Sequence, residues 1–389
     1  MDFCFTPQEE EFRKEVRQFF QRESKLVEET RKEAESGLGL GPYSWQLMRK
    51  LGERRWLAPT WPEEYGGMNA SYIQRFIIYE ELVYHAGQLT LTGAGMAGPV
   101  ILSQGSEEQK REFLPRIARG EIEFILGYTE PHAGSDLASL EIHAEDKGDY
   151  YLMNGQKVFN TAAHYGQYHW LGARTDPKAA PRHRGISLFI VDINSPGITV
   201  RPLWGMGNFR TNEVFYDDVK VPKKNRVGEE NKGWGYIGEA LSFERTYVIG
   251  RLRRLLEEIV KYAQETKRDG EVLAKDPLIR QRLAELAVEL EVAYLFAARV
   301  AWMLDRGTIP NYEAAMVKMF ASELEQRIFD VGLRILSLYG QLHPESKGAE
   351  LMGWITQSSL HAARVSITRG SSEVMRNIIA LRGLELPRG

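Results

Sequence analysis

The chain has 389 residues, more than one small hydrophobic core can organise, so we expect two or three packed domains. Hydrophobic residues make up 43% and charged residues 26%, the balance of an ordinary globular protein, and a formal net charge of -3 gives no support for nucleic acid or an anionic membrane as the main partner. A single cysteine (Cys4) leaves no internal disulfide, and we find neither a signal-peptide pattern nor an apolar run of membrane-spanning length, so we expect a cytoplasmic protein, or one of an organelle matrix after processing.

The first third of the chain has the pattern of helices. Thr6 can cap a first helix, Pro7 suits its first turn, and Glu9 completes a capping box. Apolar residues then recur every three or four positions, and a glycine-rich break at 37–41 precedes further helical stretches. We predict an N-terminal α-helical domain over residues 1–124.

A literal G-x-G-x-x-G lies in this region, formed by Gly93, Gly95 and Gly98. In a dinucleotide-binding domain this motif follows a strand and opens a helix within a βαβ unit. Here no convincing strand precedes it, and Pro99 follows the last glycine. We therefore favour close helix packing over a nucleotide site.

The middle of the chain has the sequence pattern of β-strands. From about Ile125 to Trp234 it is rich in β-branched and aromatic residues, with turn residues at short intervals. Asn154-Gly155 between two apolar runs predicts a two-residue hairpin turn, and residues 186–191 (ISLFIV) predict a buried strand. We predict an antiparallel β-domain over residues 125–234.

Helical spacing returns in the last part of the chain. Three long apolar stripes occupy residues 248–263, 283–301 and 316–338, and a fourth helix is expected near 358–379. Antiparallel helices of this length favour a four-helix bundle over residues 235–389. The predicted fold class is therefore α+β, in the order helical domain, antiparallel β-domain, helical bundle.

Residues 128–136 (YTEPHAGSD) gather hydroxyl groups and small residues in one turn. Such a loop can present hydroxyls and backbone N–H groups to a polar ligand, although a purely structural turn explains it equally well. The segment resembles the T-E-P-x-A-G-S-D signature of acyl-CoA dehydrogenases. Three more stretches resemble motifs of that family, in the same order: NGQKVFNTAA, GMGNFRTNEVFYDDVKVPKKNRVGEENKGW and RGSSEVMRNIIALRGL.

The resemblance implies FAD as cofactor. It implies hydroxyl contacts to the flavin ring from Thr129 and Thr161, with Phe159 in place of the family's usual Trp. It implies that Ser135 lies near the FAD pyrophosphate and the pantetheine of the substrate. The remaining cofactor-binding residues that it implies are Tyr128, Gly134, Arg268, Gly340, Ser371 and Glu373.

The resemblance also implies α,β-dehydrogenation of an acyl-CoA thioester, in which a carboxylate removes the α-proton. The family places this glutamate at one of two positions, and here one of them is Arg369, which cannot act as a base. The other is Glu244. Leu241 precedes Glu244 by three residues and Val248 follows it by four, so its side chain points along an apolar stripe. A catalytic base is favoured over a partly exposed glutamate in an ordinary ion pair.

Two arginines accompany the predicted base. Arg245, which matches a family arginine, could hold the carboxylate in place and contribute to substrate binding. For Arg369 three interpretations stay open: an ion pair with Glu244 that lowers the pKa of the base, a contact to an oxygen or carboxylate of an unusual acyl group, or a structural pair turned away from the site. The backbone N–H of Arg369 can serve the thioester oxygen in each case, and Gly370 is expected to contact substrate.

The chain departs from the family near the adenine end of FAD. The family often carries R-x-x-F-G…Q there, whereas this chain has Lys267-Arg268-Asp269-Gly270 and then Asp276-Pro277. Such departures motivate an alternative, a non-catalytic or half-site subunit of a hetero-oligomeric acyl-CoA dehydrogenase. A flavin monooxygenase or nitroalkane oxidase-like relative is a third interpretation. By family analogy we expect an acyl-CoA substrate, an electron-transfer flavoprotein as oxidant, and a homodimer or homotetramer, with a heterotetramer as the alternative.

Overall fold

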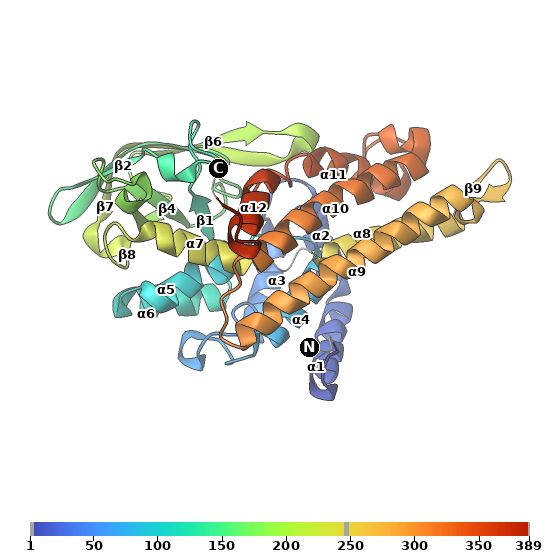
Figure 1. Cartoon of the computed structure of the whole chain (residues 1–389), viewed down its shortest axis with the longest axis horizontal. Coiled ribbons are helices and arrows are strands. Elements are labelled where there is room, and N and C mark those ends of the chain that lie inside the picture. The colour runs from blue at the N-terminus through green and yellow to red at the C-terminus, as the bar shows by residue number, and fades with distance from the viewer. Residues whose placement is uncertain (1–3, 245–248, 388–389) are drawn as a thin grey trace.

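The computed structural model describes residues 4–244 and 249–387 of the chain. Helices form the first part, a sheet the middle and long helices the last part, so the predicted fold class and order are confirmed (Figure 1). The first helix begins as expected, because the Thr6 hydroxyl accepts from Glu9 N at 3.3 Å and the Glu9 carboxylate accepts from Thr6 N at 2.7 Å. The N-terminal helices are α1 (Pro7–Arg22), α2 (Ser24–Glu35), α3 (Pro42–Glu53), α4 (Tyr72–Ala86), α5 (Gly98–Gln104) and α6 (Glu107–Ala118).

The middle region folds into one eight-stranded sheet, in the order β6-β7-β3-β2-β4-β5-β8, with β1 paired to β4. Pairing is antiparallel except where β4 meets β1 and β2. The predicted strand at 186–191 is β5, and its first six residues are buried. The strands are β1 (Phe124–Gly127), β2 (His143–Asp146), β3 (Tyr150–Lys157), β4 (Tyr168–Arg174), β5 (Ile186–Asp192), β6 (Ile198–Trp204), β7 (Arg210–Pro222) and β8 (Arg226–Val227).

The hairpin turn predicted at Asn154-Gly155 is wrong. β3 runs through both residues, and its register against β7 shifts between Met153 and Gly155. The Asn154 side chain bridges to Asp218 of β7, donating to its carboxylate and accepting from its backbone N–H, each at 2.9 Å. The pair therefore forms a β-bulge. Like a hairpin turn, a bulge favours the conformational freedom of glycine, and Gly155 has a φ of 145°.

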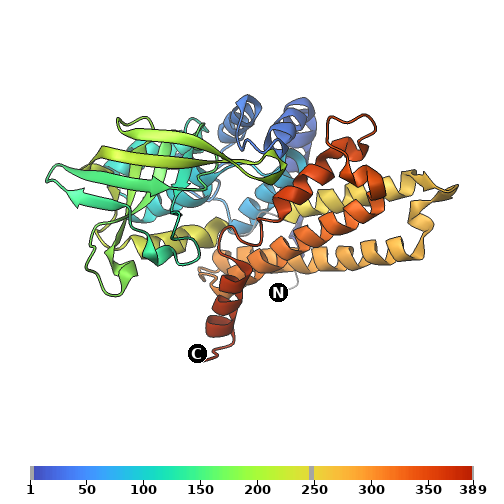
Figure 2. The same cartoon turned by 90° about the horizontal axis from the view of Figure 1, so that it is seen from above.

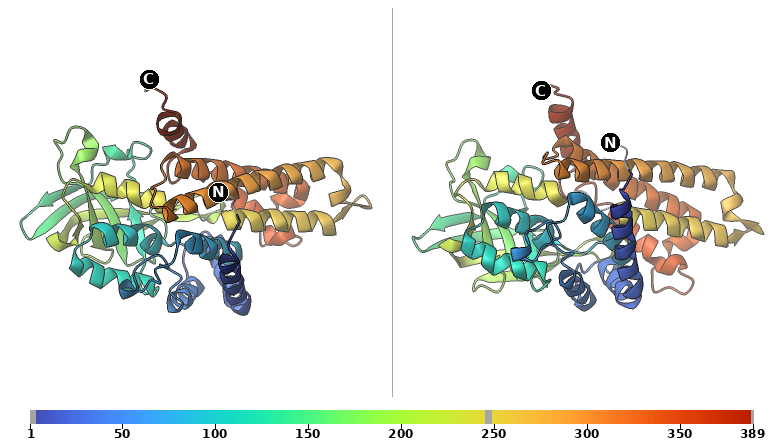
Figure 3. Two further views of the ribbon diagram at one scale, coloured as in Figure 1. Left: turned by 60° about the horizontal axis from the view of Figure 1, so that its bottom comes forward. Right: turned by 90° about the horizontal axis from the view of Figure 1, so that it is seen from below.

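The C-terminal helices extend away from the sheet as long rods (Figure 2). A small hairpin, β9 (Lys267–Arg268) and β10 (Glu271–Val272), lies at their far tip (Figures 1 and 3). The single fourth helix predicted near 358–379 is wrong, because two short helices separated by residues 363–371 replace it. The helices are α7 (Gly233–Glu244), α8 (Ile249–Glu265), α9 (Pro277–Asp305), α10 (Tyr312–Leu336), α11 (Trp354–Ala362) and α12 (Ser372–Ile378).

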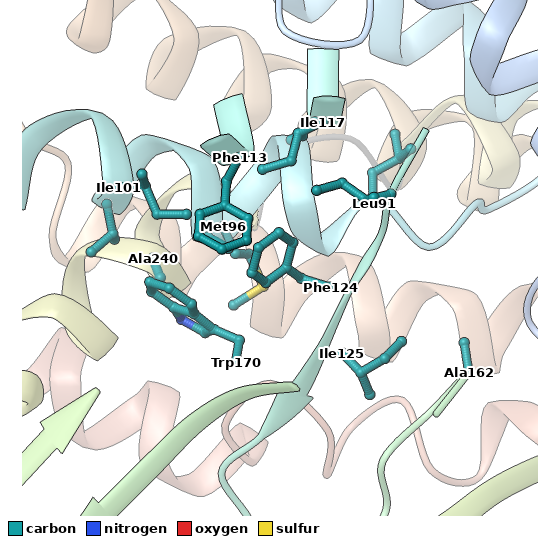
Figure 4. Close-up of a cluster of buried hydrophobic side chains, with 14 of the residues drawn as sticks. Leu91, Met96, Ile101, Phe113, Ile117, Phe124, Ile125, Ala162, Trp170 and Ala240 are labelled. Carbon is teal, nitrogen blue, oxygen red and sulfur yellow. The ribbon is translucent and has the colours of Figure 1, made fainter. Parts of the chain in front are cut away.

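One apolar core joins the N-terminal helices to the sheet. The rings of Phe113 (α6) and Phe124 (β1) lie 5.9 Å apart, and Phe124 lies 6.1 Å from Trp170 (β4), both edge to face. Figure 4 shows Met96 among these rings, with Ala240 of α7 beside them. A second core lies between the long helices. Within the described residues, no helix is both long and apolar enough to cross a bilayer.

Candidate active site

A cavity of about 480 Å³ lies where the three regions of the chain meet. Segments far apart in the sequence line it: residues 88–96, the loops that follow β1 and β3, the helices α8 and α10, and residues 364–371. The predicted site residues that the cavity brings together are Tyr128, Thr129, Gly134, Ser135, Phe159, Thr161, Arg369, Gly370 and Ser371.

Other predicted site residues lie outside this cavity. Arg268 sits in the hairpin at the tip of the long helices and donates to the carbonyl of Ile335 at 2.8 Å. Gly340 is buried after α10, and its carbonyl accepts from the Thr356 hydroxyl at 2.8 Å. Glu373 is exposed in the first turn of α12. The Glu244 side chain and Arg245 lie outside the described residues.

A buried ion pair holds the loop that carries Thr129 and Ser135. Glu130 accepts from the backbone N–H groups of Glu141 at 2.6 Å and Ile142 at 2.9 Å, and from Lys157 Nζ at 2.8 Å. Lys157 also donates to the Tyr128 carbonyl at 3.0 Å. Burial lowers the pKa of Lys157 to about 8, although the Glu130 carboxylate opposes this shift. The loop is thus tied to the start of β2 and the end of β3.

The second polar loop, residues 158–162, has a constrained backbone. Phe159 and Ala162 have φ values of 59° and 62°, a region that side chains with a Cβ disfavour. Asn160 anchors the loop by donating to the Leu126 carbonyl at 2.6 Å, while its own buried Oδ1 finds no hydrogen-bond partner among the described residues. The ring of Phe159 remains 64% exposed. The exposed ring of Phe159 and the unpaired Oδ1 of Asn160 are both features of a loop that contacts a ligand.

The cavity is also lined by a group of charged residues that we call the charged wall: Arg251, Lys318, Glu325, Arg364 and Arg369. Arg251 and Glu325 form a close ion pair. The guanidinium carbon of Arg364 lies 3.7 Å from the centroid of the Phe209 ring, and burial, with the nearby Arg369 cation, lowers the pKa of Arg364 to about 10.

Arg369 is one of the residues that line the cavity. Its Nη1 lies 3.3 Å from the oxygen of the Gln88 side-chain amide, when that amide is oriented with its oxygen toward the guanidinium. Arg369 and Gly370 have φ values of 60° and 91°, so the chain turns sharply before Ser371, whose hydroxyl accepts from Val374 N at 3.2 Å and caps α12.

Sequence reasoning missed most of the charged wall. Glu325 could have been found, because it lies four residues from both Ala321 and Phe329 on the buried face of α10, where a carboxylate needs a partner. Arg251 and Arg364 gave no comparable signal, since arginine side chains are common at protein surfaces. Their importance follows only from the cavity that they line.

Comparisons with known proteins match the whole chain. The acyl-CoA dehydrogenase N-terminal, middle and C-terminal domain models match residues 6–121, 126–219 and 231–384. Acyl-CoA dehydrogenase FadE26 of Mycobacterium tuberculosis is 35% identical over 403 residues, covering 100% of this chain and 99% of that protein. The Tcur3481-Tcur3483 steroid ACAD structure is 33% identical with a TM-score of 0.92, covering 100% of both chains. The ChsE4-ChsE5 complex from Mycobacterium tuberculosis is 34% identical with a TM-score of 0.89, also covering 100% of both chains.

Proteins of the matched family are FAD-dependent flavoproteins, and the residues present here fit a flavin ring. An isoalloxazine has a flat apolar face and a polar edge, so it needs a ring or aliphatic neighbour and nearby hydrogen-bonding groups. Phe159 supplies the exposed ring, Thr129 and Thr161 line the cavity with hydroxyl-bearing residues, and Asn160, which also lines it, has a buried Oδ1 without a hydrogen-bond partner among the described residues.

Proposed function

Because the chain belongs to the acyl-CoA dehydrogenase family, we propose that it catalyses the α,β-dehydrogenation of an acyl-CoA thioester to the trans-2-enoyl-CoA. Bound FAD would accept the β-hydride at flavin N5. One observation supports this most directly: the cavity gathers Thr129, Thr161 and residues 369–371 with Leu241 of α7. The residues proposed to bind the flavin and the helix proposed to carry the base therefore line the same cavity.

We propose Glu244 as the base that takes the α-proton. α7 ends at this residue, and Leu241, one turn earlier, lines the cavity. Residues three apart share one face of a helix, so position 244 belongs to the side of α7 that borders the cavity. A carboxylate within reach of the α-carbon is the group that this proton transfer requires.

The thioester oxygen requires a hydrogen-bond donor as negative charge develops on it. We propose the backbone N–H of Arg369 for this role, since Arg369 and Gly370 both line the cavity and form a sharp turn there. The side chain of Arg369 then forms part of the acyl site together with Gln88. Ser135, on the tethered loop, is proposed to contact the pantetheine of the substrate.

The test is anaerobic flavin bleaching with a panel of acyl-CoAs. Wild type should bleach, and Glu244→Gln should keep its FAD but lose bleaching. Glu239→Gln is the matched control on the same helix, because Glu239 accepts a hydrogen bond from Ser103 at 3.1 Å and does not line the cavity. Equal bleaching rates in wild type and Glu244→Gln would remove Glu244 from the mechanism. Reoxidation by an electron-transfer flavoprotein, compared with oxygen consumption, separates a dehydrogenase from a monooxygenase.

A second candidate is a subunit that needs a different partner chain to complete its FAD site. Arg268 is engaged by a backbone carbonyl at the tip of the long helices, away from the cavity of its own chain. Two similar structures are titled as pairs of proteins, Tcur3481-Tcur3483 and ChsE4-ChsE5. This candidate predicts little FAD in the protein expressed alone and recovery of FAD with a partner chain. One FAD per chain in the purified homo-oligomer would exclude it.

A further inference from the structure

The three glycines of the 93–98 segment do not share one role. A Cβ on Gly98 would lie 2.2 Å from the ring of Trp61, and a Cβ on Gly93 would lie 3.0 Å from the Glu123 carboxylate and 3.2 Å from Ile117. At position 98 the Trp61 ring approaches too closely for any side chain, whereas at position 93 a Cβ would require the Glu123 and Ile117 side chains to shift. These two glycines account for the predicted close packing of this segment.

Gly95 is different. A Cβ built there would meet no atom of the described residues within 4 Å, yet Gly95 is buried. It also lines the cavity. The open space beside it is therefore neither bulk solvent nor a helix contact but part of the cavity itself. Residues 93–97 form a π-helical turn, a local widening that is frequent at functional sites.

The segment that carries Gly95 lines the cavity with apolar residues and with the polar residues Gln88, Thr90 and Thr92. We call the apolar part of the lining the apolar wall; it is formed by Leu89, Leu91, Gly95, Met96, Leu126 and Leu241. Leu91 and Met96, on either side of Gly95, are anchored in the core shared by the helices and the sheet, so this wall is rigid (Figure 4). It contrasts with the charged wall, and hydrocarbon is the ligand chemistry that it suits.

We propose that Gly95 is a specificity-determining residue, which leaves room in the apolar wall for an acyl group that is broader than a straight chain, either branched or carrying a ring. This inference rests on the proposed function, because it assigns the apolar wall to the acyl group of an acyl-CoA. A side chain at position 95 would project into space that a broad acyl group needs and a slender one does not.

The experiment compares two acyl-CoAs with equal carbon number, cyclohexanecarbonyl-CoA and heptanoyl-CoA. Their dissociation constants for the FAD-loaded protein are measured by calorimetry, and kcat/KM is measured where turnover occurs. Wild type should bind the ring-bearing thioester at least as well as the straight one. Gly95→Leu should lower the ratio of ring-bearing to straight-chain affinity by about 10-fold or more, the scale of losing methylene contacts in an apolar pocket. Gly95→Ala should shift it less, in the same direction.

Gly235→Leu is the matched control. Gly235 lies in α7, a Cβ there also meets no described atom within 4 Å, and the residue is exposed and outside the cavity. It should leave the ratio unchanged. The inference is overturned if wild type prefers heptanoyl-CoA, or if both Gly95 variants leave the ratio at the wild-type value. Because binding and flavin bleaching are measured separately, a wild-type protein that binds both thioesters but bleaches with neither would contradict the proposed function alone.

Discussion

The buried pair of Glu130 and Lys157 offers the most direct test of how the active-site loop is held. Both side chains are at most 2% exposed, and their charged atoms lie 2.8 Å apart. Glu130→Gln removes the charge that the Lys157 ammonium needs and puts an amide where two backbone N–H groups donate. Lys157→Met leaves the carboxylate with both backbone donors but removes the donor to the Tyr128 carbonyl.

The two substitutions should therefore differ in size. Glu130→Gln leaves a cation buried without its counter-charge, which destabilises a folded protein by about 3–5 kcal/mol. Lys157→Met removes hydrogen bonds to a charged group and should destabilise by about 1–3 kcal/mol. Replacing both residues should destabilise by less than the sum of the two, because each single variant leaves an unmatched group that the double variant lacks.

The assay is the urea midpoint of each variant with and without FAD, together with FAD content from the visible spectrum. We expect Glu130→Gln to release FAD, since Thr129 and Ser135 lie on the same loop. Glu108→Gln is the control, because Glu108 and Lys224 lie 2.7 Å apart but are about 60% exposed; water screens such a pair, and the midpoint should barely move. If Glu130→Gln and Glu108→Gln shift the midpoint equally, burial is not what gives the Glu130 pair its strength.

Three further predictions concern stability. Burial raises the pKa of Glu123 to about 8, above its unfolded value, so the wild type should lose at most about 5 kcal/mol of stability as the pH rises from about 4.5 to 8. Thermal melts of Glu123→Gln should lack this loss. If the stability of the wild type and of Glu123→Gln changed in parallel with pH, the prediction would be contradicted. Gly98→Ala should destabilise by about 1–3 kcal/mol in urea, because its Cβ would overlap the Trp61 ring, and an unchanged midpoint would refute that packing. Asp276→Ala should destabilise by about 1 kcal/mol, since the Asp276 carboxylate caps α9 by accepting from Leu278 N at 2.8 Å; Asp276→Asn, which keeps a capping oxygen, should retain most of that stability.

The local signals of the sequence predicted the helices well. The capping box at Thr6 and Glu9 formed as expected, because its atoms lie within one turn and need no distant partner. The apolar stripes likewise became α8, α9 and α10, since a stripe at helical spacing must be buried against something. The hairpin at Asn154-Gly155 failed because a β-bulge uses the same two residues, and only the register against β7 distinguishes a bulge from a turn.

For this protein, the sequence by itself determined the order of helices and strands and the family to which the chain belongs. Periodicity and motifs are local features, so they can be recognised from neighbouring residues in the chain. Only the tertiary structure decided that the glycines at 93 and 98 serve packing while Gly95 borders a cavity, and that Arg364 lies over Phe209 beside Arg369. The physical reason is that space, burial and the sum of nearby charges depend on residues that the fold brings together from separate parts of the chain. A position's neighbours in the chain do not specify them.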